Sequence, residues 1–192
     1  MIDPLYGFVF LGLFSPGPNV VLLTASGARF GLKRTLPHLF GVVLGVGITA
    51  GLTGLGIAAL LAQVPTLALI LKLAASAWML RMAWGLWNSH RKQGDGRECP
   101  MSFVEAVLFQ WINPKVWAVA LAASSAYPGG LGAVAEAMRL GSAFSGLNLL
   151  CCLFWASAGS LLTWLLTTPR AWRIFARIMA LALGGFSVMV FL

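Results

Sequence analysis

Two prolines interrupt the first apolar segment of the chain, in the stretch Ser15-Pro16-Gly17-Pro18-Asn19. The whole segment, Leu5 to Gly27, is long and apolar enough to cross a bilayer. Proline lacks a backbone N–H and its ring clashes with the carbonyl four residues earlier, so the helix must break and free carbonyls near Gly12 and Phe14. Within a membrane, broken helices survive where they face protein or a water-filled cavity. The break therefore favours a transport site over a passive anchor.

The rest of the chain is also apolar. Of its 192 residues, 59% are hydrophobic and only 9% are charged, whereas soluble domains are about a quarter charged. We therefore expect an all-α, polytopic membrane protein forming a single transmembrane domain over residues 1–192. An amphipathic run, Phe103 to Ile112, leads into the fourth of six predicted spans. The spans are Leu5–Gly27, Pro37–Ala62, Thr66–Trp87, Asn113–Tyr127, Leu140–Leu166 and Ala171–Leu192.

The net charge of +8 predicts membrane orientation and not nucleic-acid binding, because the basic residues cluster in short connections between spans. By the positive-inside rule, the odd-numbered connections face the cytoplasm. Both termini then face out, away from the cytoplasm. The basic residues of the three cytoplasmic connections are Arg29, Lys33 and Arg34, then Arg91, Lys92, Arg97 and Lys115, then Arg170, Arg173 and Arg177.

The longest connection, a cytoplasmic linker at residues 89–102, divides the chain into halves 1–88 and 103–192. Each half has three predicted spans, so the second half must be inverted relative to the first, as in many transporters. If the halves are repeats, the fourth span should be interrupted like the first. The stretch Gln110-Trp111-Ile112-Asn113-Pro114-Lys115 meets this demand, because Asn113 precedes a proline and is pushed away from the α region.

Motifs in both halves resemble those of the LysE/RhtB family of bacterial amino-acid exporters. The resemblance implies a six-helix exporter of the bacterial inner membrane, driven by the proton-motive force, that carries an amino acid or similar metabolite. The outward-facing termini are then periplasmic. We expect no enzymatic activity and no cofactor. It covers nearly the whole chain. The motifs are Pro16-Gly17-Pro18-Asn19, Gly31-x-Lys33-Arg34, Gly41-x-x-x-Gly45, Asn113-Pro114-Lys115 and a lysine early in span three, Lys72.

The chain departs from the family in its acidic residues. Many members carry an acid directly after the second glycine of G-x-x-x-G, where this chain has Val46. Its five acidic residues all lie at span ends or in connections, so no buried carboxylate is assigned to carry a proton. They are Asp3, Asp95, Glu98, Glu105 and Glu136.

The two breaks form the predicted substrate site. Ser15 can cap a new helix with Pro16 at its first position, and the positive end of that helix dipole then faces a substrate carboxylate. We expect Asn19 and Asn113 to hydrogen-bond the substrate. The alternatives are a packing kink at the first break and, at the second, an ordinary Asn-Pro helix start whose Lys115 snorkels to the interface.

Two basic residues lie within span three. Lys72 and Arg81 are separated by nine positions, which is about 900° at 100° per residue, so they occupy opposite faces. Lys72 or Lys115 supplies the positive charge for a carboxylate, and the family resemblance favours Lys72 for a buried role. Arg81 serves a subunit contact or a substrate peculiar to this protein.

Small and polar residues in the other spans predict helix packing. The pairs Gly41/Gly45 and Gly47/Gly51 form close-packing stripes, either within the monomer or in a homodimer. Asn148 needs a partner in the membrane, most often an interhelical hydrogen bond. His38, at the cytoplasmic end of span two, is expected to be solvated.

Two alternatives to an exporter are a thiol redox carrier and a non-transporting assembly subunit. A thiol redox carrier would need a reactive cysteine in each half, but the first half has none and Cys151 and Cys152 are adjacent in one span. These two are better explained as small packing residues, and no metal-binding spacing is present. A non-transporting assembly subunit differs from an exporter only in a transport assay.

Overall fold

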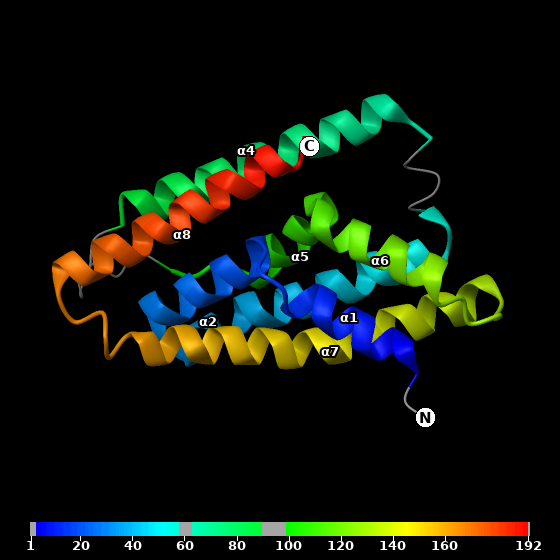
Figure 1. The fold of residues 1–192 in the computed structure, drawn as a ribbon, viewed down its shortest axis with the longest axis horizontal. Helices are drawn as coiled ribbons and strands as arrows, with labels where there is room; N and C mark the ends of the chain where they lie inside the picture. Colours follow the sequence, from blue (N-terminus) through cyan, green and yellow to red (C-terminus); the bar gives the residue numbers. More distant parts are fainter. Residues whose placement is uncertain (1–2, 58–62, 90–98, 192) are drawn as a thin grey trace.

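A computed structural model describes residues 3–57, 63–89 and 99–191, and these residues form helices and connections without strands. Figure 1 shows the helices as an elongated bundle. The helices are α1 (Pro4–Phe14), α2 (Pro18–Gly54), α4 (Pro65–Trp87), α5 (Phe103–Ile112), α6 (Pro114–Ala126), α7 (Ala133–Leu162) and α8 (Pro169–Met189).

Four of these helices, α2, α4, α7 and α8, are long and apolar enough to cross a membrane. A fifth span results if α5 and α6, which meet at an angle of 62°, are counted as one broken span. The first helix, α1, has only 11 residues. The chain is thus an all-helical, multi-pass membrane protein, as its composition predicts.

The turn between the first two predicted spans lies inside α2. Gly31 has φ 77° and ψ 166°, a backbone conformation with positive φ that favours glycine. We call residues 18–30 the first arm of α2 and residues 32–54 its second arm. Figure 1 shows the two arms running in different directions. The hydroxyl of Thr35 donates to the carbonyl of Gly31 at 2.9 Å and lies 3.0 Å from the Ser26 hydroxyl, so side chains of both arms hold the turn.

The predicted glycine stripes pack helices within the monomer. A Cβ on Gly41 would meet the Phe103 carbonyl and the Ala106 side chain of α5, and one on Gly45 would lie 2.7 Å from Cγ of Gln110. The other stripe faces α7: a Cβ on Gly47 would collide with the Ser145 hydroxyl, and one on Gly51 would lie 3.4 Å from the Ala137 carbonyl. The second arm of α2 therefore lies between α5 and α7 at close range.

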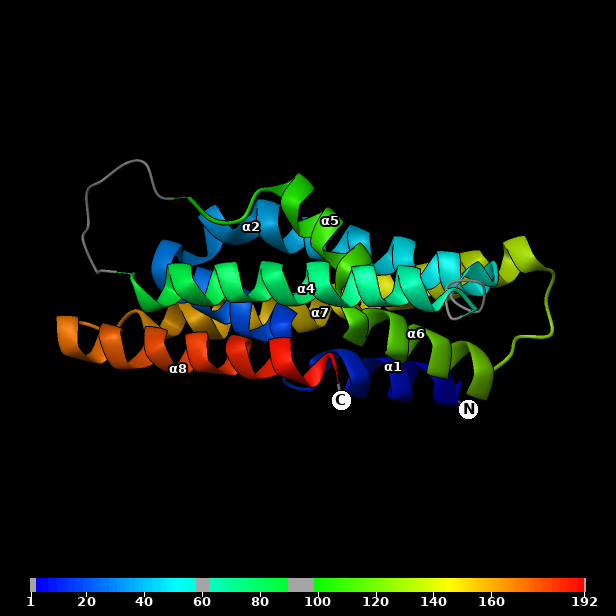
Figure 2. The same ribbon diagram turned by 90° about the horizontal axis from the view of Figure 1, so that it is seen from above.

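The remaining helices complete the bundle in pairs. In Figure 2, α4 and α8 run alongside each other, and α1 lies near α6. The first arm of α2 also approaches α7 closely, because Gly159 packs on the Thr24 carbonyl and Gly27 packs on the Ala156 carbonyl. Gly27 and Gly159 are thus a third pair of close-packing glycines, in addition to the two predicted stripes.

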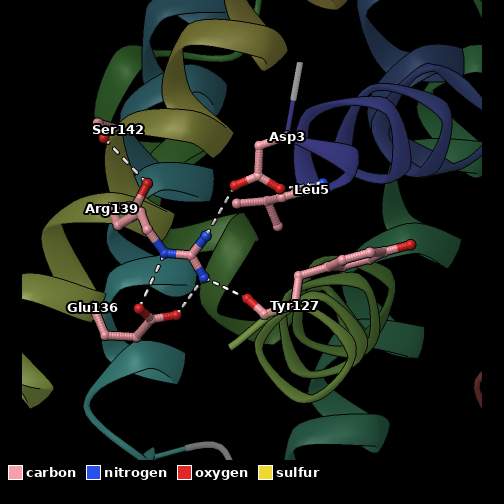
Figure 3. Close-up of polar contacts among 6 residues, drawn as sticks. All are labelled: Asp3, Leu5, Tyr127, Glu136, Arg139 and Ser142. Carbon is pink, nitrogen blue, oxygen red and sulfur yellow. Dashed lines mark hydrogen bonds and ion pairs between the residues drawn. The ribbon is translucent and has the colours of Figure 1, made fainter. Parts of the chain in front are cut away.

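One end of the bundle is held by a polar cluster around Arg139 (Figure 3). Its guanidinium donates to the Glu136 carboxylate at 2.6 and 3.0 Å and to the Tyr127 carbonyl, and it lies 3.6 Å from the Asp3 carboxylate. Asp3 in turn accepts from the Leu5 amide at 2.9 Å as the N-cap of α1. The Arg139 cluster thus joins the start of α1, the end of α6 and the start of α7.

Candidate functional site: two helix breaks joined by an amide

The first break separates α1 from α2 at residues 15–17. Ser15 has ψ 147° and Gly17 has ψ 179°, because each precedes a proline and is thereby kept out of the α region. The new helix begins at Pro18 with Gly17 as its N-cap. The prediction that Ser15 caps a helix starting at Pro16 was therefore wrong. Ser15 instead ends α1, since the second proline delays the restart by two residues.

The carbonyls freed by the first break find partners. The Ser15 hydroxyl donates to the Gly12 carbonyl at 2.9 Å, and the indole N–H of Trp155, on α7, donates to the Phe14 carbonyl at 3.3 Å. Lys115 supplies the rest: its Nζ donates to the carbonyl of Ser15 at 2.5 Å and to that of Pro16 at 3.3 Å. The break is therefore satisfied largely by side chains from the second half of the chain.

Lys115 reaches the first break from the start of α6. A Cβ on Gly17 would lie 2.7 Å from Cδ and 2.8 Å from Nζ of Lys115. Glycine at this position thus leaves the space through which the lysine passes. The ammonium group also contacts the Ser15 hydroxyl at 3.0 Å. In this structure the Lys115 ammonium group is therefore directed at the first helix break.

The second break lies at Asn113, between α5 and α6. Asn113 has φ −77° and ψ 104°, outside the α region, and Pro114 occupies the first turn of α6. The Asn113 side-chain oxygen accepts from the Lys115 amide at 3.2 Å. Asn113 is thus the N-cap of a helix that begins at Pro114, the Asn-Pro helix start given as the alternative at this break.

Gln110 connects the two breaks. Its side-chain oxygen accepts from the Asn19 amide at 2.8 Å and from the Asn113 amide at 3.4 Å. Its own amide donates to the Ala106 carbonyl one turn earlier at 3.0 Å, and the residue is fully buried. Sequence analysis gave Gln110 no role. The sequence feature that could have indicated a role for Gln110 is its side-chain amide within an apolar helix, three residues before Asn113.

A small cavity of about 20 Å³ lies where the breaks meet, which is room for about one water molecule. Among the described residues, two buried side-chain atoms here lack hydrogen-bond partners: the oxygen of Asn19 and the amide nitrogen of Asn148, on α7. The Asn19 oxygen is a hydrogen-bond acceptor and the Asn148 nitrogen is a hydrogen-bond donor. The cavity is lined by Leu13, Gly17, Asn19, Val20, Asn113, Lys115, Val116 and Asn148.

Four of the eight predicted substrate-site residues line this cavity, namely Gly17, Asn19, Asn113 and Lys115. Pro16 and Pro18 shape the first break, and Pro114 shapes the second. Lys72 is elsewhere: it is exposed on α4 and does not line the cavity. The side-chain amide nitrogen of Asn148, which lines the cavity, has no hydrogen-bond partner in the described part of the chain. An interhelical hydrogen bond was predicted for this residue.

Arg81 and His38 line a second, larger cavity nearer the turn of α2. His38 is only 2% exposed, so the expectation that it is solvated was wrong. Because the second arm of α2 begins immediately after Gly31, His38 lies on a helical turn that is packed inside the protein. Cys151 and Cys152 are buried in α7, while Cys99 is exposed.

Broken helices from both halves that meet at a buried polar cavity, inside an apolar helical bundle, define a multi-pass membrane protein of the transporter class. The LysE type translocator family model matches residues 10–192. The chain therefore belongs to the LysE type translocator family. No curated protein and no solved structure matched the chain.

Proposed function

We propose that the protein exports an amino acid or a related small metabolite across the bacterial inner membrane, driven by the proton-motive force. The substrate binds where the two helix breaks meet. The observation that carries this proposal is the hydrogen bond between Asn19 and Gln110, which joins the breaks. Beside it, the Asn19 oxygen and the Asn148 amide nitrogen have no hydrogen-bond partner among the residues that the structure describes. A buried polar atom without a hydrogen-bond partner destabilises the protein. A polar substrate that bonds to these atoms would remove that destabilisation.

Six spans in two inverted halves fit the packing. We assign the first span to α1 with the first arm of α2, the second to the second arm, and the third to α4. In the second half, the broken pair α5 and α6 is the fourth span, α7 the fifth and α8 the sixth. Each span then packs on its counterpart: α1 on α6, α2 on α7 and α4 on α8. This pairing supports a repeat related by a pseudo-two-fold axis.

The breaks offer an anionic group two kinds of positive partner. The N-termini of α2 and α6 both begin at a break, and their dipoles place partial positive charge there. The Lys115 ammonium lies at the same place, held by the Ser15 and Pro16 carbonyls. We infer that a substrate carboxylate takes Lys115 away from these carbonyls, which makes Lys115 and not Lys72 the carboxylate partner.

The cavity at the breaks is too small for an amino acid, so transport requires it to open. The two ends of the bundle differ: the Arg139 cluster ties three helices together at one end, whereas the larger cavity lies at the other, beside the basic turn of α2. With the basic connections in the cytoplasm, this arrangement corresponds to a state closed toward the periplasm, where both termini are placed.

Substitution of Asn19 tests the proposal. Asn19→Ala should abolish the resistance that overproduction of the protein gives against a toxic amino acid, while membrane insertion remains normal. Asn88→Ala is the matched control, because Asn88 is exposed at the end of α4 and its side-chain amide donates to the Trp84 carbonyl of the same helix. Full export by Asn19→Ala, at normal protein levels, would falsify the site. A panel of single amino acids given in excess identifies the substrate.

A further inference from the structure

Three arginines share one face of α8 near its start. Arg170, Arg173 and Arg177 follow one another at intervals of three and four residues. At about 100° per residue, they fall within about 60° of one another around the helix. Together with Ile174 they line a surface hollow of about 400 Å³, and all four side chains are exposed. We call this hollow the α8 arginine site.

The acidic side chains that the structure describes are engaged elsewhere. Asp3 and Glu136 both pair with Arg139, in the cluster at the opposite end of the bundle. The Glu105 carboxylate accepts from the Ser102 amide and hydroxyl at 2.9 and 2.8 Å. Among the described residues, no carboxylate forms an ion pair with an arginine of the α8 arginine site. The site therefore has room and charge for an anion that the described part of the chain does not supply.

Exposed tryptophans lie at the same end of the bundle. Trp87, the last residue of α4, is 40% exposed, and the guanidinium carbon of Arg177 lies 4.9 Å from the centre of its ring. Trp164, in the connection from α7 to α8, is 81% exposed. Tryptophans of membrane proteins are enriched at the level of the lipid headgroups. We therefore place the α8 arginine site at the depth of the lipid phosphates.

Contacts on its other face hold the start of α8 in place. The Thr168 hydroxyl, at the N-cap, accepts from the Ala171 amide at 3.1 Å. The indole N–H of Trp172 donates to the Ser89 carbonyl at 3.3 Å, and Trp172 packs in a buried cluster with Ala28 of α2. The arginines thus extend from a helix turn that is fixed to the bundle, and the N-terminal end of the helix dipole adds partial positive charge to theirs.

Beyond the arginines, the same side of α8 is apolar. Ile178, Leu181 and Val188 are 55%, 65% and 62% exposed. On a multi-pass membrane protein, exposed apolar side chains of a spanning helix face the acyl chains of the bilayer. A phospholipid matches both parts of this surface, because its phosphate meets the arginines while its acyl chains follow the apolar side chains.

We propose that the α8 arginine site binds the phosphate of an anionic phospholipid, whose acyl chains lie along the exposed apolar side of α8. Guanidinium groups bind phosphate through paired, charge-assisted hydrogen bonds. Each basic residue near the headgroups strengthens binding of anionic lipid by about fivefold. Lipid binding at this site does not depend on the proposed export function and can be measured without transport.

A simpler explanation is that these arginines only set the orientation of α8 by the positive-inside rule. That rule counts basic residues near the ends of spans and does not depend on which side of a helix they occupy. Every exposed basic residue at this end would then attract anionic lipid equally. Lys33 provides the comparison, because it is exposed just after the turn of α2 and does not line the α8 arginine site.

Native mass spectrometry of the full-length protein, released from detergent micelles, counts the lipids that stay bound. The probes are phosphatidylglycerol, phosphatidylcholine with the same acyl chains, and glycerol phosphate, which is a soluble phosphate without acyl chains. Phosphatidylglycerol should be retained at about tenfold lower concentration than phosphatidylcholine. Glycerol phosphate at the same concentration should not displace it. Equal retention of the two lipids, or displacement by glycerol phosphate, would overturn the proposal.

Variants test whether the lipid binds at the arginines. Arg173→Gln should weaken retention of phosphatidylglycerol about fivefold, and the double variant Arg170→Gln, Arg173→Gln about twentyfold. Arg173→Lys keeps the charge and should retain most of the binding, whereas Lys33→Gln should match the wild type. Circular dichroism checks that each variant folds, and the comparison of Arg173→Gln with Arg173→Lys still decides if the double variant does not. Equal losses in Arg173→Gln and Lys33→Gln, or no loss in Arg173→Gln, would refute a site on α8.

Discussion

The Nζ atom of Lys115 lies 2.5 Å from the carbonyl oxygen of Ser15, although the two residues are 100 positions apart in the chain. The lysine stands at the start of α6, and the carbonyl belongs to the residue that ends α1. A cation at the C-terminal end of a helix is favourable because it meets the negative end of the helix dipole. One half of the protein therefore completes the helix break of the other half.

Replacement of the two candidate lysines should distinguish their roles. Lys115→Met removes the charge that holds the Ser15 and Pro16 carbonyls, so we expect loss of export and a loss of about 1–3 kcal/mol in stability. Lys72→Met should preserve both, because Lys72 is exposed on α4. Thermal unfolding in detergent and the toxic amino-acid assay provide the measurements. Export lost in Lys72→Met and kept in Lys115→Met would reverse the assignment.

Removal of the Gln110 side-chain amide should remove the hydrogen bonds that join the two helix breaks. Gln110→Leu leaves the Asn19 amide without its acceptor, and we expect a loss of about 1–3 kcal/mol in stability together with reduced export. A double-mutant cycle with Asn19→Leu tests the bond itself: the double variant should be less destabilised than the sum of the single variants. Additive losses would show that the two side chains do not interact.

The glycine stripe against α5 should tolerate no side chain. Gly41→Ala places a Cβ against the Phe103 carbonyl and the Ala106 methyl group, and overpacking of this kind costs about 1–3 kcal/mol. Gly184→Ala on α8 is the matched control, since nothing lies within 4 Å of its Cβ position and alanine favours helix by about 1 kcal/mol. Similar melting temperatures for the two variants would contradict the close packing of α2 on α5.

The Arg139 cluster should govern the start of α1. Arg139→Met removes the contacts to Asp3, Glu136 and the Tyr127 carbonyl, so amide exchange in the first turn of α1 should become faster. Arg173→Met is the control for loss of a basic side chain. Hydrogen–deuterium exchange of the two variants in nanodiscs provides the comparison. Unchanged exchange at the start of α1 would show that the cluster does not hold this end of the bundle.

Local sequence rules predicted the helix breaks because their causes are local. Proline excludes its predecessor from the α region, and this rule located both breaks and the Asn113 cap. The capping preference failed at the restart of the first helix. Gly17 also precedes a proline, so the new helix begins only at Pro18, with Gly17 and not Ser15 as its N-cap.

Contacts between distant residues could not be predicted in the same way. Whether Lys115 snorkels or turns inward depends on the space above Gly17, and that space exists only once α1 and α6 are adjacent. The same holds for Gln110, whose acceptor becomes useful only when Asn19 is brought beside it. The burial of His38 likewise depends on the packing of the turn in α2.

The two glycine stripes of the second arm of α2 have a mechanical consequence. Gly41 and Gly45 face α5, while Gly47 and Gly51 face α7, so this arm approaches two helices of the second half at close range. At these four positions the arm contributes no side chain to the contact, so no rotamer need change there when a neighbour slides along the arm. We expect the second arm to stay in place while the helices that carry the breaks slide along it and shift relative to each other.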